Sequence, residues 1–222
     1  MSKPFFSIIV PAHNSALYIH KGLQSIRKQT FMDYELLVVC DDCTDNTSQV
    51  ASMYADRVLV RHFGMDGLAR NAGIDAADGE WLIFMDDDDW FLHEFVFQQL
   101  YEAAVNTDVD MLVFDFIWKG RGYYRNDGGR TNIAVWSKCW RRSFVGDTRF
   151  PAIPFNSDEP FMDEICARQP RAVWMRVPMY YYNYMREGSQ TEIHARPDGA
   201  VPESTESKEG TLPERAEGAC SC

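Results

Sequence analysis

The sequence predicts an α/β protein whose central β-sheet is mostly parallel and is covered by helices on both faces. Apolar runs alternate with helical patterns through the first half of the chain, and these runs are apolar on both strand faces. Strands of this kind are buried from both sides, which is typical of parallel sheets with crossover helices. With 222 residues, 45% of them hydrophobic, the chain is expected to form one large domain rather than two small ones.

The predicted elements follow one another in regular order from the amino end. Residues 5–10 form a continuous apolar run that predicts the first strand. Ile19, Leu23 and Ile26 then recur at i, i+4 and i+7, which marks the buried face of a helix that starts after Asn14 or Ser15. The same reasoning predicts strands at 34–40, 58–62, 81–85 and 111–116, and helices after Thr44, at 67–77, at 92–106 and at 161–167.

Residues 195–222 differ in composition from the rest of the chain. Val201 and Leu212 are the large apolar residues in this segment, which is otherwise rich in Pro, Glu, Ser and Gly. Such a segment cannot bury enough apolar surface to offset the entropy of ordering it. We therefore expect a disordered tail.

The charge balance excludes some classes of function. Lys and Arg number 22 against 33 Asp and Glu, which gives a formal net charge of −11. Because nucleic-acid affinity depends mainly on Lys and Arg contacts to phosphate, no nucleic-acid partner is expected. No apolar run approaches the roughly 20 residues of a membrane-spanning helix, and residues 1–10 are interpreted as a strand rather than a signal peptide. The expected location is cytoplasmic.

Six cysteines are present, and Cys40 and Cys43 have the spacing of redox or zinc sites. Zinc would need a second pair or suitably spaced histidines, and the sequence shows neither. Cys40 closes an apolar strand and Cys43 lies in an Asp-rich turn, which is a poor fit for a redox helix. No thiol function is expected.

Three polar, acid-rich stretches follow predicted strands, at 11–14, 41–45 and 86–89. In open α/β sheets, ligands bind beyond the carboxyl ends of the strands, so these stretches mark the expected site. The stretch 41–45 has two interpretations. It can be a simple turn and helix cap, or it can supply a carboxylate that accepts a hydrogen bond from the imide N–H of uracil.

The four consecutive acids Asp86 to Asp89 follow an apolar strand directly. If this stretch is extended, Asp86 and Asp88 share one face. Two carboxylates on one face suit Mg²⁺ or Mn²⁺, with open positions for substrate phosphates. Alternatively, Asp88 and Asp89 cap the following helix. Metal binding is favoured, because a cap needs one acid and four adjacent negative charges repel one another.

Several motifs, in consistent order and spacing, resemble those of a known family. The first half contains SIIVPAHN, YELLVVCDDCTDNT and GLARNAGIDAADGEWLIFMDDDDW, and the second half contains VWSKCWRR, SDEPF and YYYNYMREGSQT. The second-half stretches are similar to the W-x-K-x-x-R, E-D-x-P-F and late Tyr/Arg-Gly-Ser segments of that family. Over residues 5–191, the chain resembles the family 2 glycosyltransferases with the GT-A fold.

The resemblance implies a GT-A-type, Rossmann-like α/β/α sandwich over residues 1–194, with a nucleotide- and metal-binding half at 1–117 and an acceptor half at 118–194. The implied reaction transfers a sugar from a nucleotide diphosphate donor to an acceptor hydroxyl, with inversion, and uses Mn²⁺ or Mg²⁺. The implied acceptors are saccharides or lipid-linked saccharides of cell-envelope, capsule or other polysaccharide synthesis. Peripheral association with the inner face of the membrane is compatible with these acceptors.

The resemblance also implies roles for single residues. Asp88 is the implied principal metal ligand, with Asp86 beside it. Arg70 is implied to lie near the nucleotide, the alternative being a helix-surface Arg in an ordinary ion pair. Pro11, His13 and Asp42 are implied to line the base and ribose pocket. The full implied nucleotide-sugar-binding set is Pro11, His13, Asn14, Asp42, Arg70, Asp86, Asp87, Arg186 and Ser189.

Asp158 matches the Asp of E-D-x-P-F, which the resemblance implies to be the catalytic base. Ser157 stands where the family has Glu, and Glu159 adds a second acid that can substitute as a catalytic group. The alternative for Asp158 is an exposed loop acid ahead of the helix at 161–167. Cys43 replaces the usual Gly of D-D-G-S, a position where a residue with a β-carbon restricts the turn.

Two function classes besides a glycosyltransferase stay open. A nucleotidyltransferase acting on sugar phosphates also uses an α/β sheet and acid-bound Mg²⁺, but it would usually show a Gly-rich phosphate loop after the first strand. That position reads Pro-Ala-His-Asn here. A catalytically degenerate nucleotide-sugar-binding protein is favoured by the departures at Cys43 and Ser157.

Overall fold

The computed structural model of the chain describes residues 3–126 and 134–184. Their elements in chain order are β1 (Phe6–Ala12), α1 (Ile19–Arg27), β2 (Tyr34–Asp41), α2 (Thr47–Ser52), β3 (Arg57–Arg61), α3 (Asp66–Ala76), β4 (Trp81–Phe84), β5 (Trp90–Phe91), α4 (Val96–Val105), β6 (Met111–Trp118), β7 (Gly122–Tyr124), the 3₁₀ turn η1 (Val135–Ser137), β8 (Lys138–Arg141), α5 (Arg142–Val145), α6 (Asp158–Ala167) and β9 (Ala172–Tyr182).

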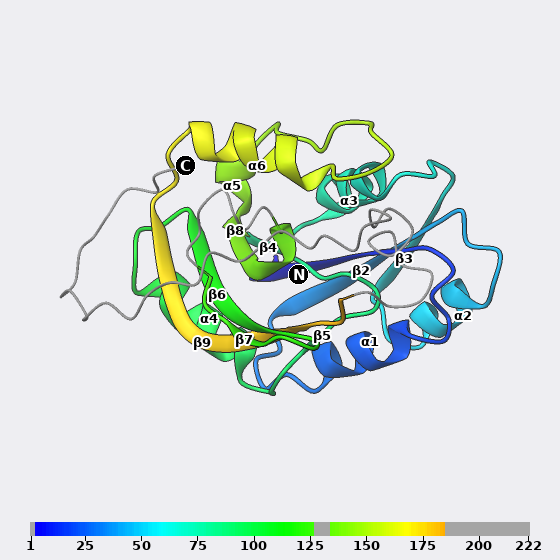
Figure 1. Cartoon of the computed structure of the whole chain (residues 1–222), viewed down its shortest axis with the longest axis horizontal. Helices are drawn as coiled ribbons and strands as arrows, with labels where there is room; N and C mark the ends of the chain where they lie inside the picture. The colour runs from blue at the N-terminus through cyan, green and yellow to red at the C-terminus, as the bar shows by residue number, and fades with distance from the viewer. Residues whose placement is uncertain (1–2, 127–133, 185–222) are drawn as a thin grey trace.

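These strands form one sheet in the order β3-β2-β1-β4-β8-β6-β9-β5, with β7 paired to β6 (Figure 1). β1, β2, β3 and β4 are parallel neighbours, and β6 and β9 form another long parallel pair. The antiparallel pairings, such as β4 with β8 and β6 with β8, join only a few residues each. The sheet is therefore mostly parallel, as the continuous apolar runs predict.

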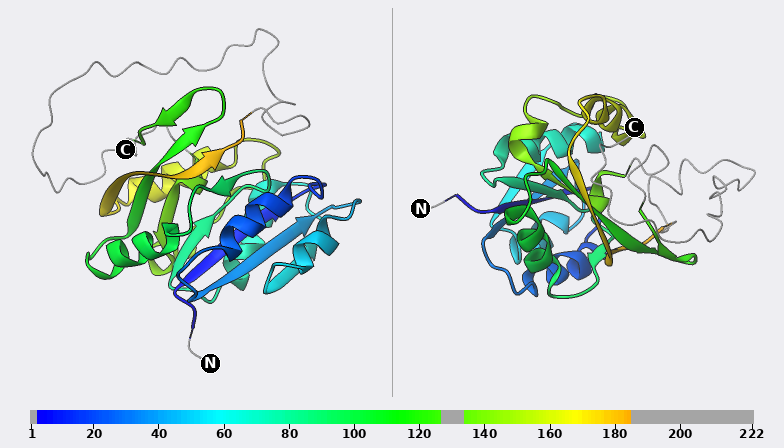
Figure 2. Two further views of the ribbon diagram at one scale, coloured as in Figure 1. Left: turned by 90° about the horizontal axis from the view of Figure 1, so that it is seen from below. Right: turned by 90° about the vertical axis from the view of Figure 1, so that its left-hand side faces the viewer.

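Helices cover both faces of this sheet (Figures 1 and 2). α1, α2 and α4 pack on one face, where Ile8 of β1 and Leu23 of α1 belong to the same buried cluster. α3, α5 and α6 pack on the other face, where Ile9 of β1, Ile74 of α3 and Phe161 of α6 share a second cluster. Ile8 and Ile9 of β1 thus enter opposite cores, which explains why consecutive residues of this strand are apolar.

The early strands and helices lie within a few residues of their predicted bounds, but the segment after the four acids differs. A helix was expected over 92–106, whereas α4 begins at Val96. Trp90 and Phe91 instead form β5, which pairs with Tyr181 and Tyr180 of β9. A strand of two residues leaves no periodic signal, and its partner lies some ninety residues later, so local patterns cannot reveal it.

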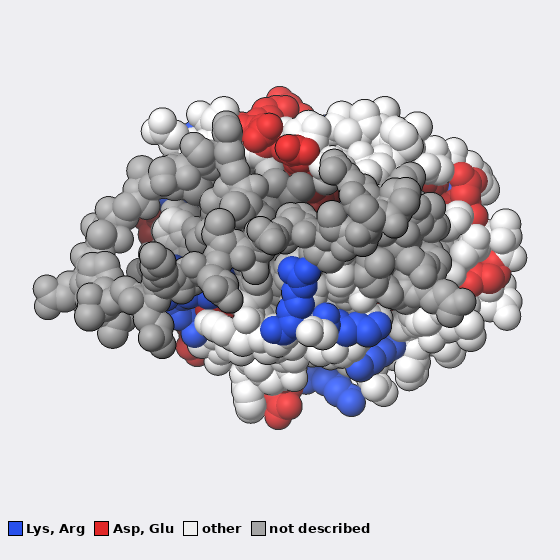
Figure 3. Space-filling model, viewed as in Figure 1, with Lys and Arg blue, Asp and Glu red and all other residues white. Residues whose placement is uncertain are grey.

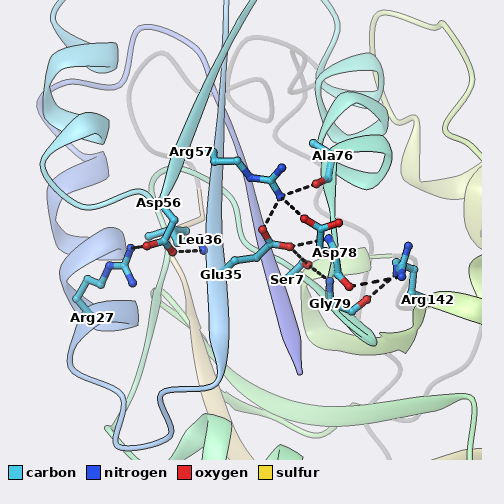
Figure 4. A network of polar contacts seen from close by, with 10 residues as sticks. All are labelled: Ser7, Arg27, Glu35, Leu36, Asp56, Arg57, Ala76, Asp78, Gly79 and Arg142. Atoms are coloured by element: carbon cyan, nitrogen blue, oxygen red, sulfur yellow. Dashed lines mark hydrogen bonds and ion pairs between the residues drawn. The ribbon is translucent and has the colours of Figure 1, made fainter. Parts of the chain in front are cut away.

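A polar network ties together the amino ends of β1 to β4 (Figure 4). Glu35 accepts hydrogen bonds from the Ser7 hydroxyl (2.6 Å), from the backbone N–H of Asp78 (2.7 Å) and from the Arg57 guanidinium (2.5 Å). The Ser7 oxygen in turn accepts the backbone N–H of Gly79 (2.8 Å). These bonds connect the starts of neighbouring strands and so help to fix their register.

The opposite, carboxyl ends of the strands bring the three predicted acid-rich stretches together. His13 follows β1, and its backbone N–H donates to Asp87 after β4 (3.1 Å), while its ring contacts the carbonyl of Asp41 at the end of β2 (2.7 Å). On the face shown in Figure 3, most of the visible Lys and Arg side chains lie over the α1 side of the molecule, and the visible acids are spread around the rim, some of them near α6. The candidate site lies at this carboxyl edge.

Candidate active site

The loop after β1 is held to the loop after β2 by side-chain hydrogen bonds. Because the Asp41 carbonyl can only accept, Nδ1 of His13 carries the proton in that bond, and Nε2 accepts from the amide of Asn14 (3.2 Å). The Asn14 amide oxygen accepts from the backbone N–H groups of Thr44 (2.7 Å) and Asp45 (3.3 Å). Asn14 therefore orders these loops, and His13 stays exposed above them.

The two acids that end β2 have different surroundings. Asp41 is buried and accepts the backbone N–H groups of Phe63 (2.6 Å) and Met65 (3.1 Å), so it fixes the loop before α3. Asp42 is partly exposed, has a positive φ of 49° and lies 3.0 Å from the His62 ring. Asp42, not Asp41, is the acid whose side chain is open to solvent.

The Cys40 and Cys43 thiols do not form a reactive pair. Burial raises the pKa of Cys40 to about 12, and burial also raises the pKa of Cys43, so both thiols stay protonated. The Cys43 thiol lies 3.3 Å from the carbonyl of Ala12. The positive φ of this turn falls on Asp42, so a β-carbon at Cys43 does not conflict with the turn.

The four acids after β4 form a tight turn rather than an extended stretch. The backbone N–H of Asp89 donates to the carbonyl of Asp86 (3.2 Å), and residues 87–88 are in a turn. The predicted alternation of Asp86 and Asp88 on one face is therefore wrong, because the chain must reverse between β4 and β5. Asp87 accepts from His13, and Asp89 is fully buried.

Asp89 is held by β9 and does not cap a helix. Its carboxylate accepts the Tyr180 hydroxyl (2.7 Å) and the backbone N–H of Asn183 (2.7 Å), and α4 has no side-chain cap. The Tyr180 oxygen also accepts the backbone N–H of Asp86 (3.1 Å). Burial, followed by the charges of Asp88 and Asp86, raises the pKa of Asp89 well above its usual range. Tyr180 thus holds both ends of the acidic turn, and the capping alternative for Asp89 is wrong.

Tyr180→Phe is expected to destabilise the protein, because the Asp89 oxygen and the Asp86 N–H both lose a buried partner. The expected loss in free energy of unfolding is about 1–3 kcal/mol, which thermal unfolding followed by circular dichroism would detect as a fall in Tm of several degrees. Tyr181→Phe is the matched control, since Tyr181 stacks on Trp90 (4.0 Å) and its hydroxyl makes no hydrogen bond to the described residues. Equal Tm values for the two variants would contradict the role of Tyr180.

Arg70 of α3 lies at the centre of an acidic cluster. Its guanidinium is hydrogen-bonded to Asp66 and to Asp86 (2.8 Å), and it lies 3.5 Å from an oxygen of Asp158. Only 6% of the Arg70 side chain is exposed. Although burial opposes it, the charges of Asp158, Asp86 and Asp66 raise the pKa of Arg70. Arg70 is therefore not a helix-surface residue in an ordinary ion pair.

Asp158 lies in the first turn of α6, which begins three residues earlier than predicted. Its side chain is 16% exposed, and its second oxygen accepts the backbone N–H of Val135 (3.2 Å). Burial raises the pKa of Asp158, opposed by the charge of Arg70. The exposed-loop alternative is wrong. Glu159, by contrast, is exposed and accepts a hydrogen bond from the Asn156 amide (2.7 Å).

Close packing of α3 against the start of α6 creates this arrangement. A β-carbon at Gly67 would lie 2.9 Å from the Ser157 side chain, so the glycine allows the two helices to approach. The Ser157 hydroxyl is buried and lies 3.4 Å from Asp66. Ser157, at the position of the family Glu, therefore lies inside the helix contact.

Sequence reasoning missed three residues of the site. Asp66 precedes Arg70 by one helical turn, a spacing that could have indicated an ion pair. Lys138 is fully buried, donates to the carbonyl of Ala134 (2.9 Å) and affects Asp158 through its charge. Tyr180 begins the YYYNYMREGSQT motif, but its contacts were not predicted, because its partners lie some ninety residues earlier in the chain.

The remaining predicted site residues are placed as follows. Pro11 is buried within β1. Arg186 and Ser189 lie outside the described residues, as does the predicted tail. Within residues 3–126 and 134–184, no group of three or more His, Cys, Asp or Glu side chains is arranged to hold a metal ion. Burial, with the charges of Asp158 and Asp88 adding to it, raises the pKa of Asp86 to about 7.

Comparison with known proteins identifies the chain. The family model described as glycosyl transferase family 2 matches residues 7–185. The chain belongs to this family. EpsH from Bacillus subtilis is 37% identical over 212 residues, which cover 82% of this chain and 61% of EpsH. A PGL/p-HBAD biosynthesis glycosyltransferase from Mycobacterium tuberculosis is 34% identical over 161 residues, covering 66% of this chain and 62% of that protein.

A solved structure of S. aureus TarS 1-349 in complex with UDP-GlcNAc superposes on this family 2 chain with a TM-score of 0.76. It is 25% identical and covers 85% of this chain and 60% of that one. The fold is thus the GT-A fold expected from the motifs. The chain spans less than two thirds of the length of these three relatives. Among the described residues, no helix is long and apolar enough to cross a lipid bilayer.

Proposed function

We propose that this family 2 protein transfers a sugar from a nucleoside diphosphate donor to an acceptor hydroxyl, with inversion at the anomeric carbon. One observation carries the proposal. Arg70 gathers Asp86, from the nucleotide-binding half, and Asp158, from the acceptor half, at the carboxyl edge of the sheet. A single displacement needs a general base on the acceptor side, which Asp158 can supply, and positive charge on the leaving-group side, which a divalent ion held by Asp86 would supply.

The donor nucleoside is proposed to lie against His13 and Asp42. Both follow adjacent parallel strands, both are at least partly exposed, and both are held by hydrogen bonds to neighbouring loops. The Asp42 carboxylate can accept the imide N–H of a uracil base. The structural relative TarS is seen with UDP-GlcNAc, which supports a UDP-sugar as the first donor to test.

The acidic turn has the chemistry to hold Mn²⁺ or Mg²⁺ together with donor phosphates. Asp86 and Asp88 can supply hard oxygen ligands, and the charges of Asp158 and Asp88 add to burial in raising the pKa of Asp86. Mg²⁺ is often held by one or two carboxylates plus substrate phosphates, so a site without a third protein ligand is compatible with it. A bound divalent ion would neutralise charge on the leaving diphosphate.

Asp158 is proposed to act as the general base. As the acceptor oxygen bonds to the anomeric carbon and the bond to the diphosphate breaks, the acceptor proton passes to Asp158, and the electron pair leaves with the diphosphate. Burial raises the pKa of Asp158, which makes its ionised form a stronger base. The hydrogen bond from the Val135 N–H holds one oxygen and fixes the direction of the other. Glu159 is retained as a second candidate for this role.

We further propose a saccharide or lipid-linked saccharide acceptor, in cell-envelope, capsule or other polysaccharide synthesis. The mycobacterial relative is named for the biosynthesis of PGL and p-HBAD, which supports a glycoconjugate acceptor. A cytoplasmic location with peripheral association at the inner face of the membrane suits such an acceptor.

A donor screen tests the proposal. Thermal unfolding is measured with UDP-, GDP- and dTDP-sugars, each with and without Mn²⁺, and release of nucleoside diphosphate is followed in the same samples. A donor is expected to raise Tm, because it binds only the folded state, and to be hydrolysed slowly without acceptor. If a donor raises Tm but is neither hydrolysed nor transferred to a supplied saccharide, the result would indicate the degenerate binding protein. Release of pyrophosphate from a nucleoside triphosphate and a sugar phosphate would indicate a nucleotidyltransferase.

A further inference from the structure

The guanidinium of Arg70 is enclosed on several sides by protein. Its two Nη atoms are committed to Asp66, Asp86 and Asp158, and its side chain is 6% exposed. The ring of Phe150 lies 5.6 Å from the guanidinium carbon and stacks on Phe161 of α6. The Nε atom is buried without a hydrogen-bond partner among the described residues. Little of this guanidinium faces the side from which a donor would enter.

The three carboxylates come from separate parts of the fold. Asp66 lies one turn before Arg70 on α3, Asp86 follows β4, and Asp158 begins α6. In the described part of the chain, Arg70 is the basic side chain that bridges the acidic turn and the start of α6. Its position therefore sets the separation between the groups assigned to the leaving-group and acceptor sides.

We propose that Arg70 is a positioning residue that does not contact the donor, and that its buried guanidinium holds Asp86 and Asp158 at their working separation while Asp66 fixes the guanidinium. This inference rests on the proposed function for the roles of Asp86 and Asp158. It replaces the expectation that Arg70 binds the nucleotide sugar directly. Asp66, to which no role was assigned, becomes a second positioning residue.

The proposed role of Arg70 depends on the planar shape of its guanidinium group. A guanidinium presents several N–H donors in fixed directions and can serve more than one carboxylate at once, whereas the Lys ammonium is a compact point charge. Arg70→Lys keeps the positive charge, so it separates the effect of charge from the effect of bridging. Asp66→Asn removes the charged partner that orients the Arg70 guanidinium. It does not change the loops that carry His13 and Asp42, where the donor nucleoside is proposed to bind.

The decisive measurement compares binding with turnover. In Arg70→Lys, kcat for UDP-sugar transfer is expected to fall about 10²-fold, because a displacement of about 1 Å in a reacting group costs that much. The dissociation constant of UDP with Mn²⁺, measured by calorimetry, is expected to stay unchanged. Asp66→Asn is likewise expected to lower kcat without changing this dissociation constant. Arg27→Lys is the matched control, since Arg27 pairs with Asp56 (3.0 Å) at the opposite ends of the strands. Unchanged kcat with weakened UDP binding would overturn the inference and return Arg70 to the donor site.

A second measurement does not need activity. Arg70→Met and Asp158→Asn are made singly and together, and Tm is measured for each. If the two groups are paired, the double variant loses less than the sum of the single losses, because the Asp158 charge that Arg70→Met alone leaves buried and unbalanced is absent from the double variant. Arg27→Met with Asp158→Asn is expected to be additive. If the decreases in Tm of Arg70→Met and Asp158→Asn are additive, the proposed contact between the two groups would be overturned. If the decreases are not additive but the wild-type protein transfers no sugar, only the proposed function would be contradicted.

Discussion

Asp158→Asn is expected to abolish sugar transfer while leaving donor binding intact. The amide cannot take the acceptor proton, and general bases contribute about 10²–10⁴-fold to rate. Asn is close to Asp in size, so its carbonyl oxygen can still accept the Val135 N–H that orients the side chain. The measurements are kcat with a supplied acceptor, and the dissociation constant of UDP with Mn²⁺, which is expected to stay near the wild-type value.

Two further variants on α6 make this result specific. Asp163→Asn removes an exposed acid from the same helix and is expected to retain wild-type kcat. Glu159→Gln tests the neighbouring acid, whose carboxylate is bonded to Asn156 on the surface. If Glu159→Gln is inactive and Asp158→Asn is active, Glu159 is the base. Retention of activity in both would remove the two acids from this role.

Removal of divalent cations is expected to produce the second largest loss. The four acids Asp86 to Asp89 are consecutive in this turn. Burial, followed by the charges of Asp158 and Asp88, raises the pKa of Asp86. An anionic diphosphate approaching this turn needs a cation. EDTA is expected to reduce turnover by roughly 10²-fold or more, since a metal contributes several kcal/mol of charge stabilisation. Addition of Mn²⁺ in excess of EDTA is expected to restore it.

A titration of the ion separates a specific site from general screening. Asp88→Asn is expected to raise the Mn²⁺ concentration needed for half-maximal turnover, while Asp78→Asn, an acid at the opposite end of the sheet, is expected to leave it unchanged. Full activity in EDTA would contradict the metal proposal. It would leave basic side chains other than Arg70 to neutralise the diphosphate.

The parallel half of the fold could be predicted because the patterns that indicate its strands and helices each lie within a short stretch of sequence. β1 and β2 are apolar on both faces, and the Ile19, Leu23 and Ile26 spacing fixes the buried side of α1. The second half could not be predicted in the same way. β5 has two residues, and β9 is only partly buried and changes register near Asp115, so neither shows a clear period.

The candidate site, too, could be predicted only where its features depend on neighbouring residues. Position at the end of a buried strand was enough to single out Asp42 and Asp86, because the carboxyl ends of parallel strands meet at one edge. The conformation of the acidic turn was predicted wrongly, because its reversal depends on the pairing of β5 with β9. The roles of Lys138 and Tyr180 were missed because their partners lie on other elements, whereas Asp66 pairs with Arg70 on the same helix and its i,i+4 spacing was overlooked.

From the amino-acid sequence we predict the mostly parallel sheet, the edge where the candidate site residues gather and the family to which the chain belongs. These properties follow from apolar periodicity and from ordered motifs, both of which involve residues that are close together in the sequence. The burial of Arg70 and its pairing with both Asp86 and Asp158 become visible in the folded chain. That contact depends on the close approach of α6 to α3 at Gly67, and the packing of two helices about ninety residues apart leaves no trace in local sequence.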